Sequence, residues 1–276
     1  MNPKLEEKLC KMFLWLMASL TVFVLLAIIG NVLSHGLAHL NLDFFLQSPR
    51  NMGKEGGILS SIIATLYLIV VSLLITVPIG IGSAVFLTEY KKKGKLLKLI
   101  RFTTESLAGI PSIIFGIFGF AFFVIFLGMG WSILSGGLTL ALMILPTMVR
   151  TGEEAISSVP NSFREGSLAL GATRWQTIVG VVIPSALPGI ITGVILSMGR
   201  AVGESAAVIL TAGSSLGIPK SLLDPGRSMS VHLYVLAAEG ISMENAYATG
   251  TVLIIVILLI NFAANYLTHR QRAKTS

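Results

Sequence analysis

The sequence has little charge. Only 12% of its 276 residues are Asp, Glu, Lys or Arg, whereas 54% are hydrophobic, and soluble globular domains carry about 25% charged residues. A soluble fold of this length cannot hide so much apolar surface behind so few charges. We therefore predict an all-α integral membrane protein, most of whose length lies in or against a lipid bilayer.

Other absences exclude whole classes of protein. A single cysteine, Cys10, rules out an internal disulfide framework. No cluster of metal ligands is present, and His35 and His39, which share a helical face, are interpreted as an interfacial pair. The sequence contains no Gly-x4-Gly-Lys-[Ser/Thr] phosphate loop, so this chain cannot hydrolyse ATP itself. We expect no catalytic residue, cofactor or metal on this chain.

The charges that are present lie in short clusters between long uncharged stretches. The formal net charge is +7, which by itself is compatible with a nucleic-acid partner. No basic run is interleaved with aromatic residues that would stack on bases, and this argues against nucleic acid.

A membrane-crossing helix needs about 20 apolar residues, and six segments satisfy this requirement. The uncharged stretch 106–149 is too long for one helix, and Gly128-Met129-Gly130 predicts a turn near its middle. The predicted spans lie in Met12–Leu33, Gly56–Thr88, the two halves of Ser106–Val149, Pro188–Ala212 and Tyr247–Leu267.

The positive charges predict the orientation of these spans. Of the 20 Lys and Arg residues, 15 lie in the N-terminus, the segment 91–101, the segment 150–174 and the C-terminal tail, and four lie on the opposite side. Because cytoplasmic loops carry the excess of Lys and Arg, both termini are predicted to be cytoplasmic. The organisation predicted is an N-terminal segment with the first helix (1–56), a membrane core (57–267) and a cytoplasmic tail (268–276).

The cytoplasmic loop 151–177 is unusual because it carries large apolar side chains, Phe163, Leu168 and Trp175. One interpretation is that they pack against the loop's own helices or the membrane edge. The other is that two short helices fill a groove on a soluble partner. Gly171 is placed to end the first of these helices. Composition and spacing alone leave both interpretations open.

A family resemblance favours the second interpretation. Glu165-Gly166-Ser167, then Gly171, then Val181-Val182-Ile183-Pro184 resembles the EAA motif of ABC importer permeases, with the family's spacing throughout. The alanines of that motif are replaced by Gly and Ser here. The resemblance implies a type I (MetI-like) permease fold, and it implies that this loop docks into a separate ATP-hydrolysing subunit. The residues assigned to coupling are Phe163, Glu165, Gly166, Ser167, Gly171 and Trp175.

Three longer segments, at 107–119, 198–207 and 228–240, resemble permeases of the phosphate-specific importer, and the last resembles its PstA-type subunit. This resemblance implies a multi-pass inner-membrane protein that transports phosphate. It also implies a heterodimer with a PstC-type permease, a dimer of PstB-type ATPase chains that bind ATP and Mg, and an external PstS-type phosphate-binding protein. A permease for sulfate, molybdate or phosphonate would share the topology and the EAA loop.

Two charges, Arg200 and Glu204, interrupt the predicted fifth span. Their i, i+4 spacing predicts that they share a helical face and offset each other's cost in the membrane. They are interpreted either as a structural salt bridge or as part of the substrate pathway, in which the planar fork of Arg200 suits phosphate oxygens. Arg150, at the predicted end of the fourth span, is a further pathway candidate or a snorkelling end residue.

Two other functional classes fit the sequence less well. An ATP-independent transporter or channel would use Arg200 and Glu204 as an ion relay, but such a protein needs no docking loop. An intramembrane enzyme built on Ser205 is excluded, because no His or Lys lies within the spans to activate that hydroxyl.

Overall fold

The computed structural model describes residues 3–90 and 94–275. Within these residues the regular structure is helical, apart from one isolated β-bridge between Arg50 and Glu55. Part of the predicted basic segment 91–101, namely Lys91, Lys92 and Lys93, and the last residue of the predicted tail, Ser276, lie outside the described residues.

Five helical segments of the described chain are long and apolar enough to cross a membrane. They contain α1 (Pro3–Gly36), α3 (Leu59–Val85), α6 (Ile133–Ser157), α9 (Ile183–Gly203) and α12 (Met243–Thr275). α3 continues into a π-helical turn, η3 (Phe86–Tyr90), and α9 follows α8 (Arg174–Thr177) and a second π-helical segment, η5 (Ile178–Val182), without a break. The first, second, fourth and sixth predicted spans are thereby confirmed.

The third predicted span is a bent pair of helices. α4 (Lys95–Ala108) and α5 (Ser112–Gly119), which continues into the π-helical η4 (Phe120–Phe126), meet at 100° around Gly109–Pro111. A proline disfavours helical geometry at the residue before it, and this accounts for the break. The pair makes a sixth span if it is counted as one. The predicted turn after it is confirmed, since Gly128 and Gly130 have φ of 66° and 64°.

The predicted fifth span, 188–212, was wrong at both ends. The spanning helix begins at Arg174 and stops at Gly203, and α10 (Ala206–Thr211) follows as a separate short helix. The remaining elements are connectors: η1 (Leu37–His39), α2 (Leu42–Leu46), η2 (Asn51–Gly53), α7 (Asn161–Ala169) and α11 (Met229–Ala238).

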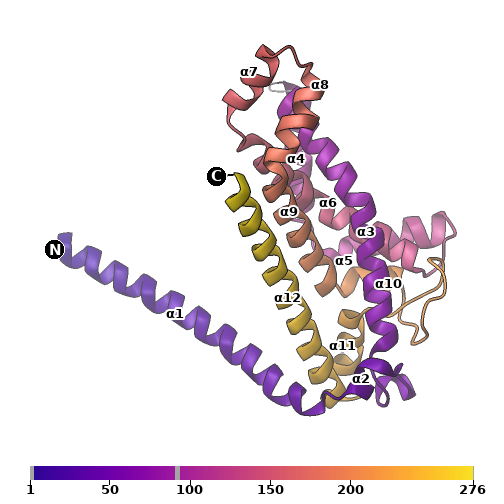
Figure 1. The fold of residues 1–276 in the computed structure, drawn as a ribbon. Helices are drawn as coiled ribbons and strands as arrows, with labels where there is room; N and C mark the ends of the chain where they lie inside the picture. The colour runs from indigo at the N-terminus through magenta and orange to yellow at the C-terminus, as the bar shows by residue number, and fades with distance from the viewer. Residues whose placement is uncertain (1–2, 91–93, 276) are drawn as a thin grey trace.

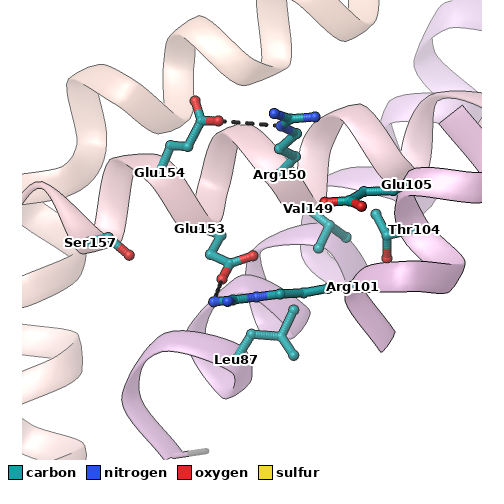
Figure 2. Close-up of a pocket in the computed structure, with 9 residues that line it drawn as sticks. All are labelled: Leu87, Arg101, Thr104, Glu105, Val149, Arg150, Glu153, Glu154 and Ser157. Atoms are coloured by element: carbon teal, nitrogen blue, oxygen red, sulfur yellow. Dashed lines mark hydrogen bonds and ion pairs between the residues drawn. The ribbon is translucent and has the colours of Figure 1, made fainter. Parts of the chain in front are cut away.

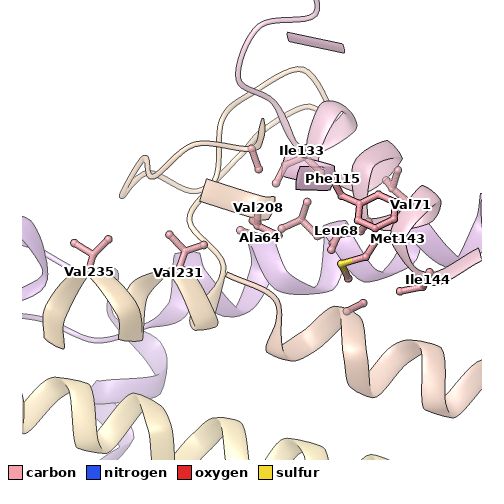
Figure 3. Packing of buried hydrophobic residues seen from close by; sticks show 13 residues of the cluster. Ala64, Leu68, Val71, Phe115, Ile133, Met143, Ile144, Val208, Val231 and Val235 are labelled. Carbon is pink, nitrogen blue, oxygen red and sulfur yellow. The ribbon is translucent and has the colours of Figure 1, made fainter. Parts of the chain in front are cut away.

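The largest buried cluster lies where α3, α5, α6, α9, α10 and α11 meet, and Figure 3 shows its side chains from close by. Leu68 and Val71 of α3 pack there with Met143 and Ile144 of α6. Close approach of α3 and α6 depends on a small residue, because a Cβ at Gly137 would lie 2.4 Å from Val71 Cγ1. Small residues at such contacts are how membrane helices pack in the absence of a hydrophobic driving force between them.

α1 leaves the body of the molecule at an angle and touches it only near its C-terminal end (Figure 1). The most apolar stretch of its span has no residue buried within the chain. The contact is made with α12, where His35 stacks on Tyr247 at 5.1 Å and Thr251 donates a hydrogen bond to the Val32 carbonyl at 3.2 Å. From this junction the two helices carry both chain ends away from α2 (Figure 1).

Candidate functional site

The predicted coupling loop forms two short helices, α7 and α8, at one end of the molecule (Figure 1). α6 extends to Ser157, so the predicted loop boundary at Thr151 was too early. α7 begins at Asn161, with Pro160 in the N-cap position. The two helices are separated by Leu170–Thr173.

Gly171 ends α7 as the sequence predicts. Its φ is +86°, the left-handed region that glycine enters without steric cost. The N–H of Gly171 bonds to the Leu168 carbonyl at 3.0 Å and that of Ala172 to the Ser167 carbonyl at 3.2 Å, which is the Schellman pattern. The following helix starts with a capping box between Thr173 and Gln176. Backbone geometry therefore fixes the turn between the two helices.

The apolar side chains of the loop are exposed. Phe163 is 51% exposed, Trp175 62% and Leu170 91%. Glu165 and Gly166 are exposed beside them, while Ser167 is half-buried and its hydroxyl lies 3.0 Å from that of Thr177. Phe163, Leu168 and Trp175 are thus not packed against the loop's own helices, and packing at the membrane edge, the other part of the first interpretation, stays a prediction. Phe163, Leu170 and Trp175 form an exposed apolar knob beside Glu165 and Gly166.

The predicted pair of Arg200 and Glu204 is not formed. α9 ends at Gly203, and Glu204 follows it in an extended conformation with ψ of 124°. The Glu204 carboxylate accepts the N–H of Ala207 at 3.1 Å and so caps α10, while its carbonyl accepts the Ser230 hydroxyl at 2.6 Å. The expectation of a shared helical face was therefore wrong, because the helix stops before Glu204.

Arg200 lies in the last turn of α9 and is half-buried. The ion pairs found among the described residues join Arg101 to Glu153, Arg150 to Glu154 and Arg164 to Glu89. Arg200 takes part in none of them. Within the described part of the chain, its guanidinium has no carboxylate to neutralise it.

Arg150 lies inside α6 and not at its end, which corrects the prediction. It pairs with Glu154 one turn later at 3.4 Å, and both side chains are 68% exposed. Figure 2 shows this pair beside a cavity of about 290 Å³ between α4 and α6, where Arg101 and Glu153 also pair. Structure thus places Arg150 on a charged surface, in a different region from Arg200.

Residues 76–275 match the family described as "Binding-protein-dependent transport system inner membrane component". The chain belongs to this family. It is thus a transport permease of the inner membrane, and membership implies a separate substrate-binding protein and an ATPase as partners.

Two relatives cover nearly the whole permease. The probable ABC transporter permease protein YqgI of Bacillus subtilis (strain 168) is 36% identical over 97% of this chain and 96% of its own length. The phosphate transport system permease protein PstA of Pasteurella multocida (strain Pm70) is 34% identical over 95% of this chain and 94% of its own.

Solved structures confirm the fold. A bacterial alginate ABC transporter in complex with an alginate pentasaccharide-bound periplasmic protein matches with a TM-score of 0.67 at 20% identity, over 97% of this permease and 96% of that chain. The inward-facing MetNI methionine ABC transporter matches with a TM-score of 0.62 at 20% identity, over 78% and 94%. The predicted type I, MetI-like permease fold is thereby confirmed.

Sequence reasoning missed the residues that hold the permease's coupling loop in place. Glu89, at the end of η3, is 6% exposed and pairs with Arg164 of α7. The signal available was a carboxylate directly after the uncharged stretch 56–88, and Arg164 beside the EAA-like residues.

A second group that the sequence did not predict lies around the start of α11. It contains Arg227, in the connector before α11, and His232, on α11 itself, next to the loop 50–56. Arg227 is 6% exposed and donates to the carbonyls of Ser214 (2.9 Å) and Met52 (3.5 Å). His232 is 1% exposed. Its burial lowers the pKa of the imidazole to about 4, and the positive charge of Arg227 contributes to the same shift. This group ties the loop 50–56 to the first turns of α11.

Proposed function

We propose that this chain is the PstA-type permease subunit of an ATP-driven importer of inorganic phosphate. The observation that carries the proposal is the match over nearly the full chain to proteins named as PstA phosphate permeases, in Pasteurella multocida at 34% identity and in Haemophilus influenzae (strain ATCC 51907 / DSM 11121 / KW20 / Rd) at 30% over 97% of this chain.

The chain supplies half of a translocation pathway. With six spans, this chain needs a second permease half to enclose the pathway, and a PstC-type permease supplies it. Of two PstB-type ATPase chains, which bind ATP and Mg, one docks on the knob formed by Phe163, Leu170 and Trp175. A PstS-type phosphate-binding protein delivers the ion on the outer side. This arrangement places both termini in the cytoplasm, in agreement with the excess of Lys and Arg on that side.

Arg200 is the residue of this chain that meets the anion. A guanidinium is always charged and presents a planar fork of donors that matches phosphate oxygens. Its lack of an ionic partner among the described residues supports this role. Glu204 serves beside it by holding the start of α10. Arg150, on the charged surface of α6, is a second candidate on the cytoplasmic side of the path.

The mechanism is alternating access. ATP binding closes the pair of ATPase chains, the coupling loops move with them, and the spanning helices open the outer mouth to the loaded binding protein. Hydrolysis of ATP then resets the inward-facing state.

The test is uptake of radiolabelled phosphate into proteoliposomes that hold this chain with its three partners. Uptake that requires ATP and resists excess sulfate, molybdate and phosphonate supports the proposal. Uptake of one of these anions in place of phosphate would overturn the assignment of phosphate as the substrate, while the proposed importer architecture would stand. Uptake without ATP would overturn the coupling and favour a secondary transporter.

A further inference from the structure

Glu89 lies at the point where the coupling loop meets the spanning helices. Its carboxylate oxygen Oε1 receives both Nε of Arg164, at 2.9 Å, and Nη2 of the same residue, at 2.8 Å. The two side chains are only 7% and 14% exposed. Both nitrogens converge on one carboxylate oxygen in a charge-assisted contact with little solvent, which restricts direction as well as distance. α7 is therefore held to the end of α3 in one orientation.

Arg164 also holds the end of α6. Its Nη1 donates to the Val159 carbonyl at 2.6 Å, and its Nη2 donates to the Ile156 carbonyl at 2.9 Å. The last carbonyls of a helix have no partner within the helix, and a cation there is favoured by the helix dipole. One arginine of the loop thus binds the cytoplasmic ends of two spanning helices, α3 and α6.

The second helix of the loop reaches the same residue by another route. Arg174 of α8 donates to the main-chain carbonyl of Glu89, and its guanidinium lies over the ring of Tyr90, 5.3 Å from the ring centre. This carbonyl belongs to η3, the π-helical end of α3, where main-chain acceptors are again left free. Both helices of the loop are therefore attached to Glu89, one through its side chain and one through its main chain.

Space remains around these contacts. A cavity of about 400 Å³ opens between the loop helices and the end of α3, and Glu89, Arg164 and Arg174 line it together with apolar Leu168 and Ile178. Val159 and Ile178, which flank the two loop helices, pack with Ala84 and Val85 of α3 in a buried apolar cluster. The polar contacts at Glu89 attach α7 and α8 themselves.

From these contacts we infer that Glu89 is the positioning residue through which movement of the coupling loop reaches α3 and α6, with Arg164 and Arg174 as its two attachments. The inference rests on the proposed function, because it assigns a route to the ATP-driven movement. Glu89 belongs neither to the anion site proposed at Arg200 nor to the exposed knob. Its loss therefore disconnects hydrolysis from transport and leaves each partner present.

The experiment compares Glu89→Gln with the wild type in the reconstituted four-component complex, measuring phosphate uptake and ATP hydrolysis in the same vesicles. We expect the phosphate taken up per ATP hydrolysed to fall at least tenfold, with the hydrolysis rate within about twofold of wild type. Glu89→Asp, which keeps the charge, is expected to recover part of the ratio. Glu244→Gln, which removes an exposed carboxylate at the start of α12, serves as the matched control and leaves the ratio unchanged.

A purely structural role of Glu89 predicts a different result for uptake and hydrolysis. If uptake and hydrolysis fell in parallel, or if neither changed, the inference would be overturned. If Glu89→Gln did not assemble, Arg164→Lys, which keeps the charge and loses the fork, provides the same comparison of uptake with hydrolysis.

A wild-type complex that takes up no phosphate would overturn the proposed function instead. In that case the connection between α7 and α3 is measured with spin labels on the two helices. The labels are attached at Ser162→Cys and Gly82→Cys in a Cys10→Ser background. Both label sites are exposed, and a Cβ at Gly82 meets no atom within 4 Å. We expect the label distance to stay constant on ATP binding in the wild type and to change in Glu89→Gln. A constant distance in both would overturn the inference.

Discussion

The carboxylate of Glu204 is bound to the main-chain N–H of Ala207, 3.1 Å away, and not to Arg200 one turn before it. The two charges that appear as a pair in the sequence therefore have separate roles. Glu204 caps a short helix, and Arg200 is left without a carboxylate partner among the described residues.

This separation predicts different effects of two similar substitutions. Arg200→Gln is expected to abolish ATP-dependent phosphate uptake while the complex stays assembled, because the charge that meets the anion is lost. Glu204→Gln keeps an oxygen that can accept the Ala207 N–H, so uptake is expected to stay within about threefold of wild type. Loss of a cap altogether, as in Glu204→Ala, costs about 1 kcal/mol. Uptake assays on complexes with each of the three variants compare these effects. Equal losses of uptake for Arg200→Gln and Glu204→Gln would contradict the prediction.

The exposed knob of the coupling loop gives a second prediction. Large aromatic residues at the centre of an interface contribute about 2 kcal/mol or more to binding, which corresponds to roughly a 30-fold change in Kd. Trp175→Ala is therefore expected to weaken binding of the ATPase subunit by about this factor. Leu42→Ala, which removes an exposed apolar side chain from α2 at the far end of the molecule, is the control. Titration of the ATPase onto the permease in detergent compares the two, and equal affinities would contradict the docking role.

Charge reversal in the same loop is a third prediction. Glu165 is exposed on α7 and is part of the EAA-like motif. Glu165→Lys is expected to detach the ATPase or to uncouple its hydrolysis from uptake, whereas the fold, which does not depend on this exposed side chain, is retained. Copurification of the ATPase distinguishes detachment from uncoupling. Normal copurification together with a normal ratio of uptake to hydrolysis would remove Glu165 from the coupling residues.

Local patterns were sufficient for several features of this fold. A long uncharged stretch marks a span because charges are costly in lipid, and the spacing from Glu165 to Pro184 indicated the permease family to which the chain belongs. The end of α7 at Gly171 could be predicted because the left-handed position after a helix favours glycine. Each of these signals depends on neighbours along the chain.

Distant contacts account for what the sequence did not reveal. The break at Glu204 is held by the hydroxyl of Ser230, which lies 26 residues later on α11. Glu89 meets Arg164 across 75 residues. The sequence predicted a span that ends at Arg150, yet α6 continues to Ser157, where Ile156 is buried and its carbonyl accepts a hydrogen bond from Arg164. The bend before Pro111 does have a local signal, the proline itself.

Acid sensitivity is a fourth prediction, and it concerns His232. Its pKa is lowered to about 4 by burial, against about 6.5 in the unfolded chain. Between these values the unfolded state binds a proton that the folded state does not, so stability is complete above pH 6.5 and falls as the pH falls from 6.5 to 4. The loss is about 2 kcal/mol by pH 5. His232→Gln does not titrate, and we expect the difference in melting temperature between pH 7 and pH 5 to be smaller in this variant. An unchanged difference would show that other groups cause the acid sensitivity.

The junction of α1 and α12 gives the last prediction. A Cβ at Gly36 would lie 2.1 Å from the hydroxyl oxygen of Thr251 and 2.3 Å from the Tyr247 carbonyl oxygen, which belongs to the backbone and cannot move aside alone. Gly36→Ala therefore forces α1 away from α12, at a cost of about 1–3 kcal/mol for overpacking. Gly30 lies on the same helix with no atom within 4 Å of a Cβ, so Gly30→Ala is neutral or gains up to about 1 kcal/mol from helix propensity. Thermal unfolding of the two variants in detergent makes the comparison. Because α1 touches the body only at this junction, equal melting temperatures would mean that the contact contributes nothing to the stability of the fold.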